Sequence, residues 1–173
     1  MLHVIGRRRG AGDVGDMLVD CHARIRSFSE LAIAVSERTD APADEVIGAC
    51  ARVERYFAEA LPLHVRDEEE SVLPRLVGRT SAIDAALERM HEQHEMHVEL
   101  LARLLACSAA LRAAPQDLAA RAALLAVAQP LRAVFEPHLQ AEEEILFPAL
   151  RALLSLDEQQ AILGELRERR SAP

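Results

Sequence analysis

Apolar residues recur at intervals of three and four along most of the chain, a pattern that predicts amphipathic α-helices. A first helix is expected to begin near Asp13 or Asp16, because either side chain can cap it, and to end around Thr39. A second helix is expected to follow Pro42, which suits a first helical turn, and Pro62 should kink or break it. The stripes are Leu18, His22, Ile25, Ser29, Ala32 and Ile33 or Ser36 in the first helix, and Val46, Cys50, Val53, Phe57 and Leu61 in the second.

A third helix is predicted in the second half of the chain. Thr80 or Ser81 can cap its start, and the pattern fades at residues 113–114. Its inward face is expected to carry Ile83, Leu87, Met90, His94, Leu101 and Leu105.

A fourth helix and a short fifth helix complete the pattern. Asp117 restarts the chain, and the fourth helix should bend at Pro130 and Pro137, the second of which directly precedes a histidine. Ser155 and Glu158 have the spacing of a capping box, which predicts the start of the last helix.

The fold class predicted is all-α. Four long helices with short connections form most simply an up-down-up-down four-helix bundle, here followed by a short C-terminal fifth helix. Residues 1–12 are expected to be a flexible tail, residues 13–153 the bundle, and residues 154–173 the short helix with its tail. Ferritin-like di-iron bundles are the alternative fold, but their E-x-x-H motif differs from the H-x-x-x-E found here.

Composition narrows the class of protein. The net charge of −8 over 173 residues argues against a nucleic-acid partner, because phosphate contacts need clustered Lys and Arg. No uninterrupted apolar stretch of about 18 residues is visible, so no membrane span is expected. The N-terminal sequence lacks the order of a signal peptide, which favours a cytoplasmic location. The three cysteines have no C-x-x-C spacing, so buried reduced thiols are favoured over a redox or zinc site. They are Cys21, Cys50 and Cys107.

A stretch of thirteen residues occurs twice, 74 positions apart: HVRDEEESVLPRL at 64–76 and HLQAEEEILFPAL at 138–150. Each copy contains H-x-x-x-E, and residues four apart lie on one face of a helix. An imidazole and a carboxylate on one face are two potential metal ligands. The other glutamates of each copy rotate by about 100° per residue, so they should mostly face water. These are Glu69, Glu70, Glu143 and Glu144.

The duplication extends to a lone histidine in each half, His22 and His94, which lie 72 positions apart. Four imidazoles and two carboxylates suit iron or manganese better than a thiolate-rich zinc site. The alternative is that each H-x-x-x-E is a surface ion pair, but two pairs in register with two lone histidines favour metal. The predicted ligands are His22, His64, Glu68, His94, His138 and Glu142.

Three other residues are possible additional ligands: His97, His91 and Tyr56. His97 and His91 lie about 60° to either side of His94, and Tyr56 lies two turns before the second helix's histidine.

The expected orientation of Leu73 and Phe147 does not fit their large apolar side chains. On an ideal helix each points about 180° away from its own histidine. Either the helix is distorted near the following proline, or the fifth helix covers these residues.

The order H…HxxxE…H…HxxxE, with L-x-P-type endings after each glutamate cluster, resembles the hemerythrin-like, HHE cation-binding domain over about residues 13–153. The resemblance implies a non-heme di-iron centre inside a four-helix bundle, in which the four histidines are terminal ligands and Glu68 and Glu142 bridge the irons. The invertebrate oxygen carriers of that family have a histidine where Val98 stands here, and an aspartate five residues after the fourth helix's histidine. Here the glutamate at +4 is Glu142 and that at +5 is Glu143. The resemblance is therefore to the H-HxxxE-H-HxxxE branch rather than to the carriers.

The resemblance implies two non-heme iron ions with an oxo or hydroxo bridge as cofactor. The expected function is reaction with a small oxidant, hydrogen peroxide or O2, and catalase-like turnover is one form that this reaction can take. The alternatives are a sensor of iron, oxygen or nitric oxide, and a protein that repairs iron–sulfur clusters. In each case the expected partner is a small molecule such as O2, peroxide or NO. The sequence leaves open whether the protein is an enzyme, which residues are catalytic, and which protein partner it has.

Overall fold

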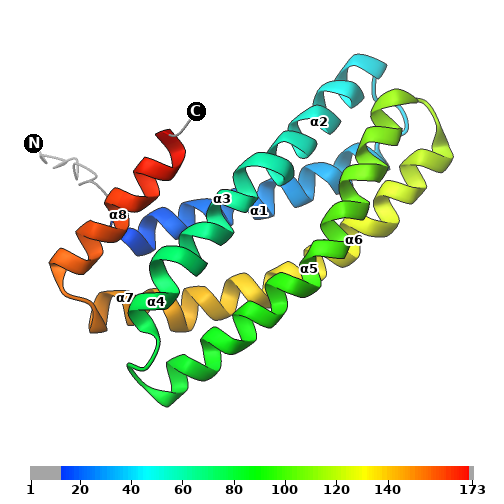
Figure 1. Cartoon of the computed structure of the whole chain (residues 1–173). Helices are drawn as coiled ribbons and strands as arrows, with labels where there is room; N and C mark the ends of the chain where they lie inside the picture. Colours follow the sequence, from blue (N-terminus) through cyan, green and yellow to red (C-terminus); the bar gives the residue numbers. More distant parts are fainter. Residues whose placement is uncertain (1–12, 172–173) are drawn as a thin grey trace, which may run out of the picture.

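A computed structural model describes residues 13–171, and among these residues it contains helices and short turns but no strand (Figure 1). The expected N-terminal tail lies outside the described residues. The helices are α1 (Val14–Glu37), α2 (Ala43–Arg55), α3 (Leu61–Arg66), α4 (Leu73–Leu76), α5 (Ser81–Ala113), α6 (Leu118–Ala141), α7 (Phe147–Leu153) and α8 (Leu156–Ser171). Three π turns join successive helices without interrupting the rod: Tyr56–Ala60, Asp67–Val72 and Glu142–Leu146.

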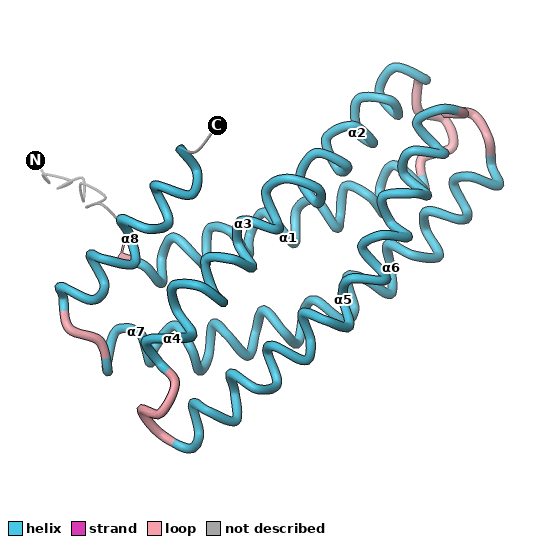
Figure 2. Tube along the Cα trace, in the orientation of Figure 1, coloured by secondary structure: helices cyan, strands magenta, loops and turns pink. Residues whose placement is uncertain are grey.

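Four rods form the bundle. The first is α1, the second runs from α2 through α4, the third is α5, and the fourth is α6 with α7. α1 contacts α2 and α6, and α5 also contacts α2 and α6, so the rods stand at the corners of a square. Short loops at the two ends connect consecutive rods, as Figure 2 shows. This confirms the predicted all-α bundle with a fifth helix, α8, which leans on the start of α1 (Figure 1).

Side-chain caps mark the start of three of the four rods and of α8, whereas α2 has no side-chain cap. The Asp13 carboxylate accepts a hydrogen bond from the Asp16 backbone N–H, and Thr80 Oγ1 accepts one from the Ile83 N–H. Before α8, the Ser155 N–H donates to Glu158 while the Ser155 hydroxyl accepts from the Glu158 N–H. The predicted capping box is therefore confirmed.

Each π turn ends two residues before a proline: Pro62, Pro74 or Pro148. The Leu61, Leu73 and Phe147 N–H groups donate to carbonyls five residues earlier instead of four. A proline has no N–H, and its ring clashes with the carbonyl four residues before it in a regular α-helix. A wider turn removes that clash by inserting one extra residue. The expected break at Pro62 is present as the π turn Tyr56–Ala60. Pro130 and Pro137, in contrast, lie inside α6, which remains α-helical.

The extra residue resolves the orientation of Phe147. It rotates everything that follows by about 100°, which turns Phe147 from the outer face toward the core. The ring is 1% exposed and its centroid lies 5.0 Å from that of His22. Leu73, its counterpart in the first copy, is only half-buried. The fifth helix contributes as well, since Ile162 and Leu166 of α8 are buried in the same apolar cluster as Phe147.

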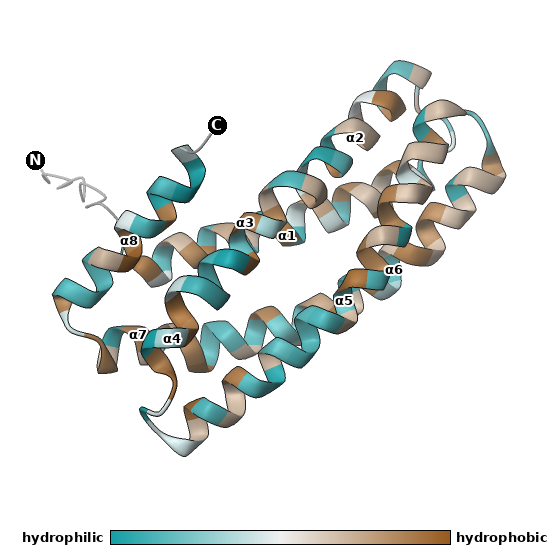
Figure 3. Ribbon diagram, viewed as in Figure 1, coloured by the Kyte–Doolittle hydropathy of each residue, from teal (hydrophilic) through white to brown (hydrophobic). Residues whose placement is uncertain are grey.

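Two apolar clusters fill the bundle, one at each end. Hydrophobic and hydrophilic residues are interspersed along the rods, as Figure 3 shows. The inward stripe of α5 differs from the prediction toward its C-terminal end. Leu104 is fully buried, whereas Leu101 and Leu105 are half-buried. The buried positions follow a seven-residue repeat, as in supercoiled bundles, so the stripe shifts by one residue along a long helix. From the middle of α5 onward they are Met90, His94, His97, Leu104, Ser108 and Leu111.

The continuous helix from Leu118 to Leu153 is long and apolar enough to cross a membrane by length and composition. Arg121 and Arg132 interrupt its apolar residues, so the absence of an uninterrupted apolar stretch still holds, and the absence of a membrane span stays a prediction. One such helix is weak evidence for a membrane span, because the core helix of a bundle passes the same test.

The cysteines follow the prediction in part: Cys21 and Cys50 are buried and Cys107 is partly buried, and all three are free thiols.

Candidate metal centre

The six predicted ligands lie together in a polar layer between the two apolar clusters. All are 0–9% exposed. The potential ligand atoms form two groups, in each of which all atoms lie within 4.8 Å of one another. One group consists of His22, His64, Glu68 and Glu142, and the other of His94, His138 and Glu142. The two groups share Glu142, so the site offers places for two cations side by side.

The geometry repeats the sequence duplication. Within each copy, the histidine Nε2 lies 3.3 Å from the carboxylate four residues later, in His64–Glu68 and in His138–Glu142. Each carboxylate also faces a lone histidine from another rod. His22 Nε2 lies 3.1 Å from Glu142 Oε2, and His94 Nε2 lies 3.5 Å from Glu68 Oε2.

Buried polar atoms without partners mark the centre of this layer. Among the described residues, neither carboxylate oxygen of Glu68 or Glu142 has a hydrogen-bond partner, and neither has His22 Nε2 or His64 Nε2. Leaving such groups unpaired in the interior costs free energy, more for charged groups than for neutral ones. A cation bound by these atoms removes that cost. The donor set, imidazole nitrogens with carboxylate oxygens, fits iron or manganese.

Burial and charge determine the protonation of the metal-free site. Burial opposes protonation of His22, but the adjacent Glu142 and Glu68 carboxylates outweigh it and raise the pKa of His22 to about 10. Burial raises the pKa of Glu68 well above its usual range, and the charge of Glu142 adds to the rise. Burial lowers the pKa of His64, and it lowers that of His138 to about 3. His22 therefore carries a proton at neutral pH in the metal-free protein, and that proton must leave before Nε2 can bind a metal.

The glutamates that follow Glu68 and Glu142 orient the lone histidines. Glu143 Oε1 lies 2.9 Å from His22 Nδ1, and Glu69 Oε1 lies 3.1 Å from His94 Nδ1. A carboxylate that accepts the Nδ1–H leaves the Nε2 lone pair free for a metal. The prediction that these two glutamates mostly face water is therefore wrong, since both are only half-exposed and paired across rods. Their occurrence at the same place in both copies was the signal for this role in the sequence.

The two halves differ around the histidines of the repeat. Gln93 Oε1 lies 2.9 Å from His138 Nδ1, but His64 Nδ1 has no partner among the described residues. Cys21 stands at the position that corresponds to Gln93 at the 72-residue offset. Next to Glu68, the buried Asp67 accepts hydrogen bonds from two arginines of α8, whereas the corresponding residue of the second copy is an alanine. These arginines are Arg169 and Arg170.

None of the three possible additional ligands belongs to the two groups of ligand atoms. His97 comes nearest: it is buried, and its ring centroid lies 5.2 Å from that of His138. His91 is exposed beside Glu69. Tyr56 stacks on Phe28 and its hydroxyl donates to a backbone carbonyl of α1, so it packs the core.

Val98 does not occupy an inward position. It is 64% exposed, because the buried stripe of α5 passes from His94 to His97, three residues later rather than four. The place where the carriers of the resembling family have a histidine is therefore near the surface in this protein.

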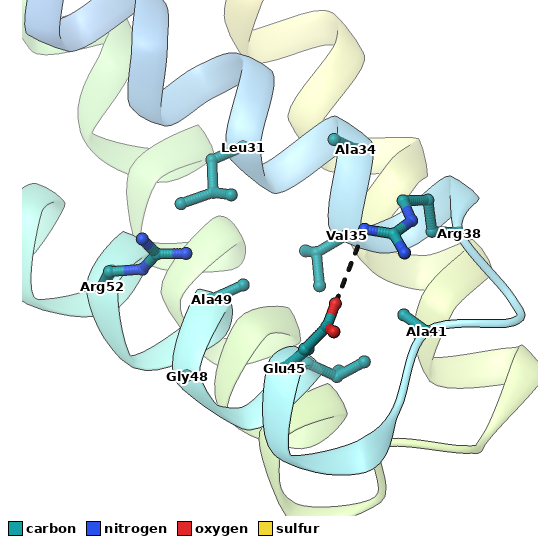
Figure 4. A pocket seen from close by; sticks show the side chains of 10 residues that line it. Leu31, Ala34, Val35, Arg38, Ala41, Glu45, Gly48, Ala49 and Arg52 are labelled. Atoms are coloured by element: carbon teal, nitrogen blue, oxygen red, sulfur yellow. Dashed lines mark ion pairs between the residues drawn. The ribbon is translucent and has the colours of Figure 1, made fainter.

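A cavity of about 460 Å³ borders the site on one side. It lies between α3 and α5 and reaches His64, His94 and His138. A second hollow, of about 380 Å³, lies at the other end of the bundle between α1 and α2, where Arg38 and Glu45 face each other at 3.6 Å (Figure 4). No histidine or cysteine lines that hollow, so it has no part in the metal centre.

Comparison with known proteins agrees with this geometry. The family model described as the hemerythrin HHE cation-binding domain matches residues 13–107 and, in a second overlapping match, residues 85–170. No curated protein sequence matches the chain. Since the two matches together cover nearly the whole chain, the protein belongs to the hemerythrin HHE cation-binding domain family.

Proposed function

We propose that the protein binds two iron ions in this site and reacts with a small oxidant, hydrogen peroxide or O2. The observation that carries the proposal is the convergence of unpartnered carboxylate and imidazole atoms in two groups that share Glu142. Membership in a cation-binding family of the hemerythrin type favours iron. A cytoplasmic location and the absence of a nucleic-acid partner stay predictions.

The residues divide into those that hold the metals and those that prepare them. His22 and His64 would hold one ion and His94 and His138 the other, with Glu68 and Glu142 between the ions. Iron supplies two adjacent one-electron centres and acts as a Lewis acid on a small oxidant. Glu69, Glu143 and Gln93 fix the imidazole rings through Nδ1, and the apolar clusters on both sides exclude water.

The ligand count favours reaction over reversible oxygen carriage. Four imidazoles and two carboxylates leave open coordination positions on two metals. The structure supports this count, because Val98 faces outward and His97 lies outside both groups of ligand atoms.

The first test is metal stoichiometry. Anaerobic loading with ferrous iron is expected to give two irons per chain, and a value near zero or one would overturn the proposal.

The second test is reactivity. Hydrogen peroxide added to the iron-loaded protein is expected to be decomposed with oxygen evolution. A stable spectrum in air that reverses under argon, without oxygen evolution, would assign the protein to the carriers instead.

A sensor is the second candidate, and the α8 contacts favour it. Arg169 and Arg170 bind Asp67, which directly precedes the proposed ligand Glu68, so metal occupancy and the docking of α8 involve neighbouring residues. A sensor of this kind releases α8 when the metal leaves. Hydrogen exchange of the α8 amides, measured with and without iron, tests this. Faster exchange in the iron-free protein, confined to α8 and residues 67–72, supports the sensor. Exchange in α8 that does not change when iron is removed excludes it.

A further inference from the structure

The cavity beside the metal centre is far larger than a small oxidant needs. A water molecule takes about 30 Å³ of liquid volume, and hydrogen peroxide has one oxygen atom more. The cavity measures about 460 Å³, a volume in the range of sites that bind small organic molecules. A cavity of this volume beside the proposed metal centre can admit a molecule much larger than hydrogen peroxide.

The cavity walls are apolar over most of their length. They include Phe57, Leu61, Leu101 and Phe135. Phe57 and Phe135 are buried and nearly parallel, with ring centroids 6.4 Å apart. A wall of this composition suits a hydrocarbon or a phenyl group, because burial of apolar surface supplies the binding free energy.

Apolar atoms make up most of the wall surface, but half of the lining residues are polar or charged: His64, Arg66, Glu69, His91, His94, Glu95, His97 and His138. At the inner end His64, His94 and His138 belong to the ligand groups, and His97 contacts Phe135 edge-on at 4.6 Å. At the outer end the wall includes Val98 and His91, which are 64% and 58% exposed. A molecule that enters past Val98 would thus place one end at the metal ligands and its apolar body along α5.

We propose that this cavity binds the hydrocarbon part of an organic hydroperoxide, with the O–O group at the histidine end. The inference rests on the proposed function, since it specifies the peroxide that the site uses. Reduction of a hydroperoxide breaks the O–O bond and forms an alcohol and water. It consumes two protons from solvent and two electrons from two ferrous ions, which become ferric.

The test measures binding without iron, so it does not depend on catalysis. Metal-free protein is titrated with 2-phenyl-2-propanol, the alcohol formed from cumene hydroperoxide, and binding is followed by NMR. We expect saturable binding with a Kd on the order of millimolar or tighter, with shifts of resonances at Val98 and Leu101. The absence of saturable binding would overturn the inference.

Two matched pairs of variants locate the bound alcohol. Val98 and Met96 are equally exposed on α5, at 64%, but only Val98 lines the cavity. Val98→Trp narrows the mouth and is expected to weaken binding several-fold, whereas Met96→Trp leaves it unchanged. Leu101 and Leu105 are both half-buried, and Leu101→Trp, which fills the cavity, should weaken binding at least about tenfold relative to Leu105→Trp. Equal affinities within both pairs would show that the alcohol binds elsewhere.

Failure of this inference can be distinguished from failure of the proposed function. If iron binds and hydrogen peroxide is decomposed but the alcohol does not bind, only the organic substrate is excluded. If the alcohol binds in the cavity but iron does not bind, the proposed function is overturned and the cavity remains a binding site.

Discussion

Consecutive glutamates in each copy of the repeat face different groups. Glu68 and Glu142 point into the polar layer, where their oxygens have no hydrogen-bond partner among the described residues. Glu69 and Glu143 reach across to the Nδ1 atoms of lone histidines on other rods. Glu144, one residue further, is exposed and accepts only from a glutamine on its own rod. A change of one residue in position therefore changes a proposed ligand into a group that contacts a histidine Nδ1, and then into a surface group.

This order predicts a graded loss of metal. Glu68→Ala and Glu142→Ala each remove ligands and should lower the iron content well below two per chain. Glu69→Ala and Glu143→Ala leave the ligands in place and should weaken metal affinity by about 10- to 100-fold, the usual effect of removing such an orienting group. Glu144→Ala is the control and should have no effect. Competition with a chelator of known affinity measures all five variants, and equal losses would contradict the assignment.

The protonation of His22 predicts how metal binding depends on pH. Burial and the two carboxylates together give His22 a pKa of about 10 in the metal-free protein, so it carries a proton at pH 7. A metal ligand must be deprotonated, and metal binding therefore releases that proton. Since the proton competes at every pH below about 10, apparent affinity should rise as pH increases from 6 to 8. Release of at least one proton per chain into a weakly buffered solution at pH 7 checks this, and no release would contradict it.

At the residue scale, the H-x-x-x-E spacing and the repeat of a lone histidine were enough to select six side chains that the structure brings together. That they bind metal stays a prediction. Spacing could not show that Glu69 and Glu143 turn toward histidines of other rods, since that depends on how rods are placed. The same limit applies to His97. Its inward direction follows from the seven-residue repeat of α5, whereas a 3.6-residue period places it to one side of the stripe.

The π turns allow the second and fourth rods to serve both the site and the core. In the turn Glu142–Leu146, the inserted residue leaves His138 and Glu142 four apart yet turns Phe147 inward. An ideal helix cannot satisfy both requirements, and this is why ideal geometry predicted Phe147 on the wrong face. Pro148 was visible in the sequence as a source of distortion, but neither the kind of distortion nor its direction followed from it.

A deletion tests this account of the turn. Removing Glu144 from the turn shortens it to a regular α-helical turn and leaves Phe147 directed inward. Pro148 then clashes with the carbonyl four residues before it, so the deletion alone should cost about 3 kcal/mol. The double variant, with the deletion and Pro148→Ala together, should regain most of the lost free energy of unfolding. Urea unfolding of the metal-free protein measures both.

A second deletion serves as the control for that experiment. Ala133 is exposed in the regular part of α6, where no inserted residue exists. Its removal rotates His138 by about 100° relative to the preceding part of the helix and should abolish iron binding. If the Glu144 deletion lowers the free energy of unfolding by the same amount with and without Pro148, the proline is not the reason for the turn.

For the whole molecule, the polar layer divides the interior into two apolar clusters. One cluster packs at the end that carries the loops after α1 and α5, and the other packs under α8. The layer between them buries two carboxylates and four imidazoles with few internal hydrogen bonds. Binding of metal to such a site and stability of the fold are coupled, because the unfolded chain has no preformed site. The sequence indicated the bundle and the layer, but not that α8 closes one end through Asp67.

Metal removal should therefore lower the stability of the entire bundle. A ligand present at about 1,000 times its Kd stabilises the native state by about 4 kcal/mol. For a chain of this length such a change raises Tm by on the order of 10 °C. Thermal unfolding of the iron-loaded protein and of the chelator-treated protein, followed by circular dichroism at 222 nm, measures the difference. The double variant Glu68→Ala, Glu142→Ala is the control, since it lacks both shared carboxylates and its Tm should not respond to iron. A wild-type Tm that is the same with and without iron would mean that the polar layer is stable without a cation, and the unpartnered atoms would then need another explanation.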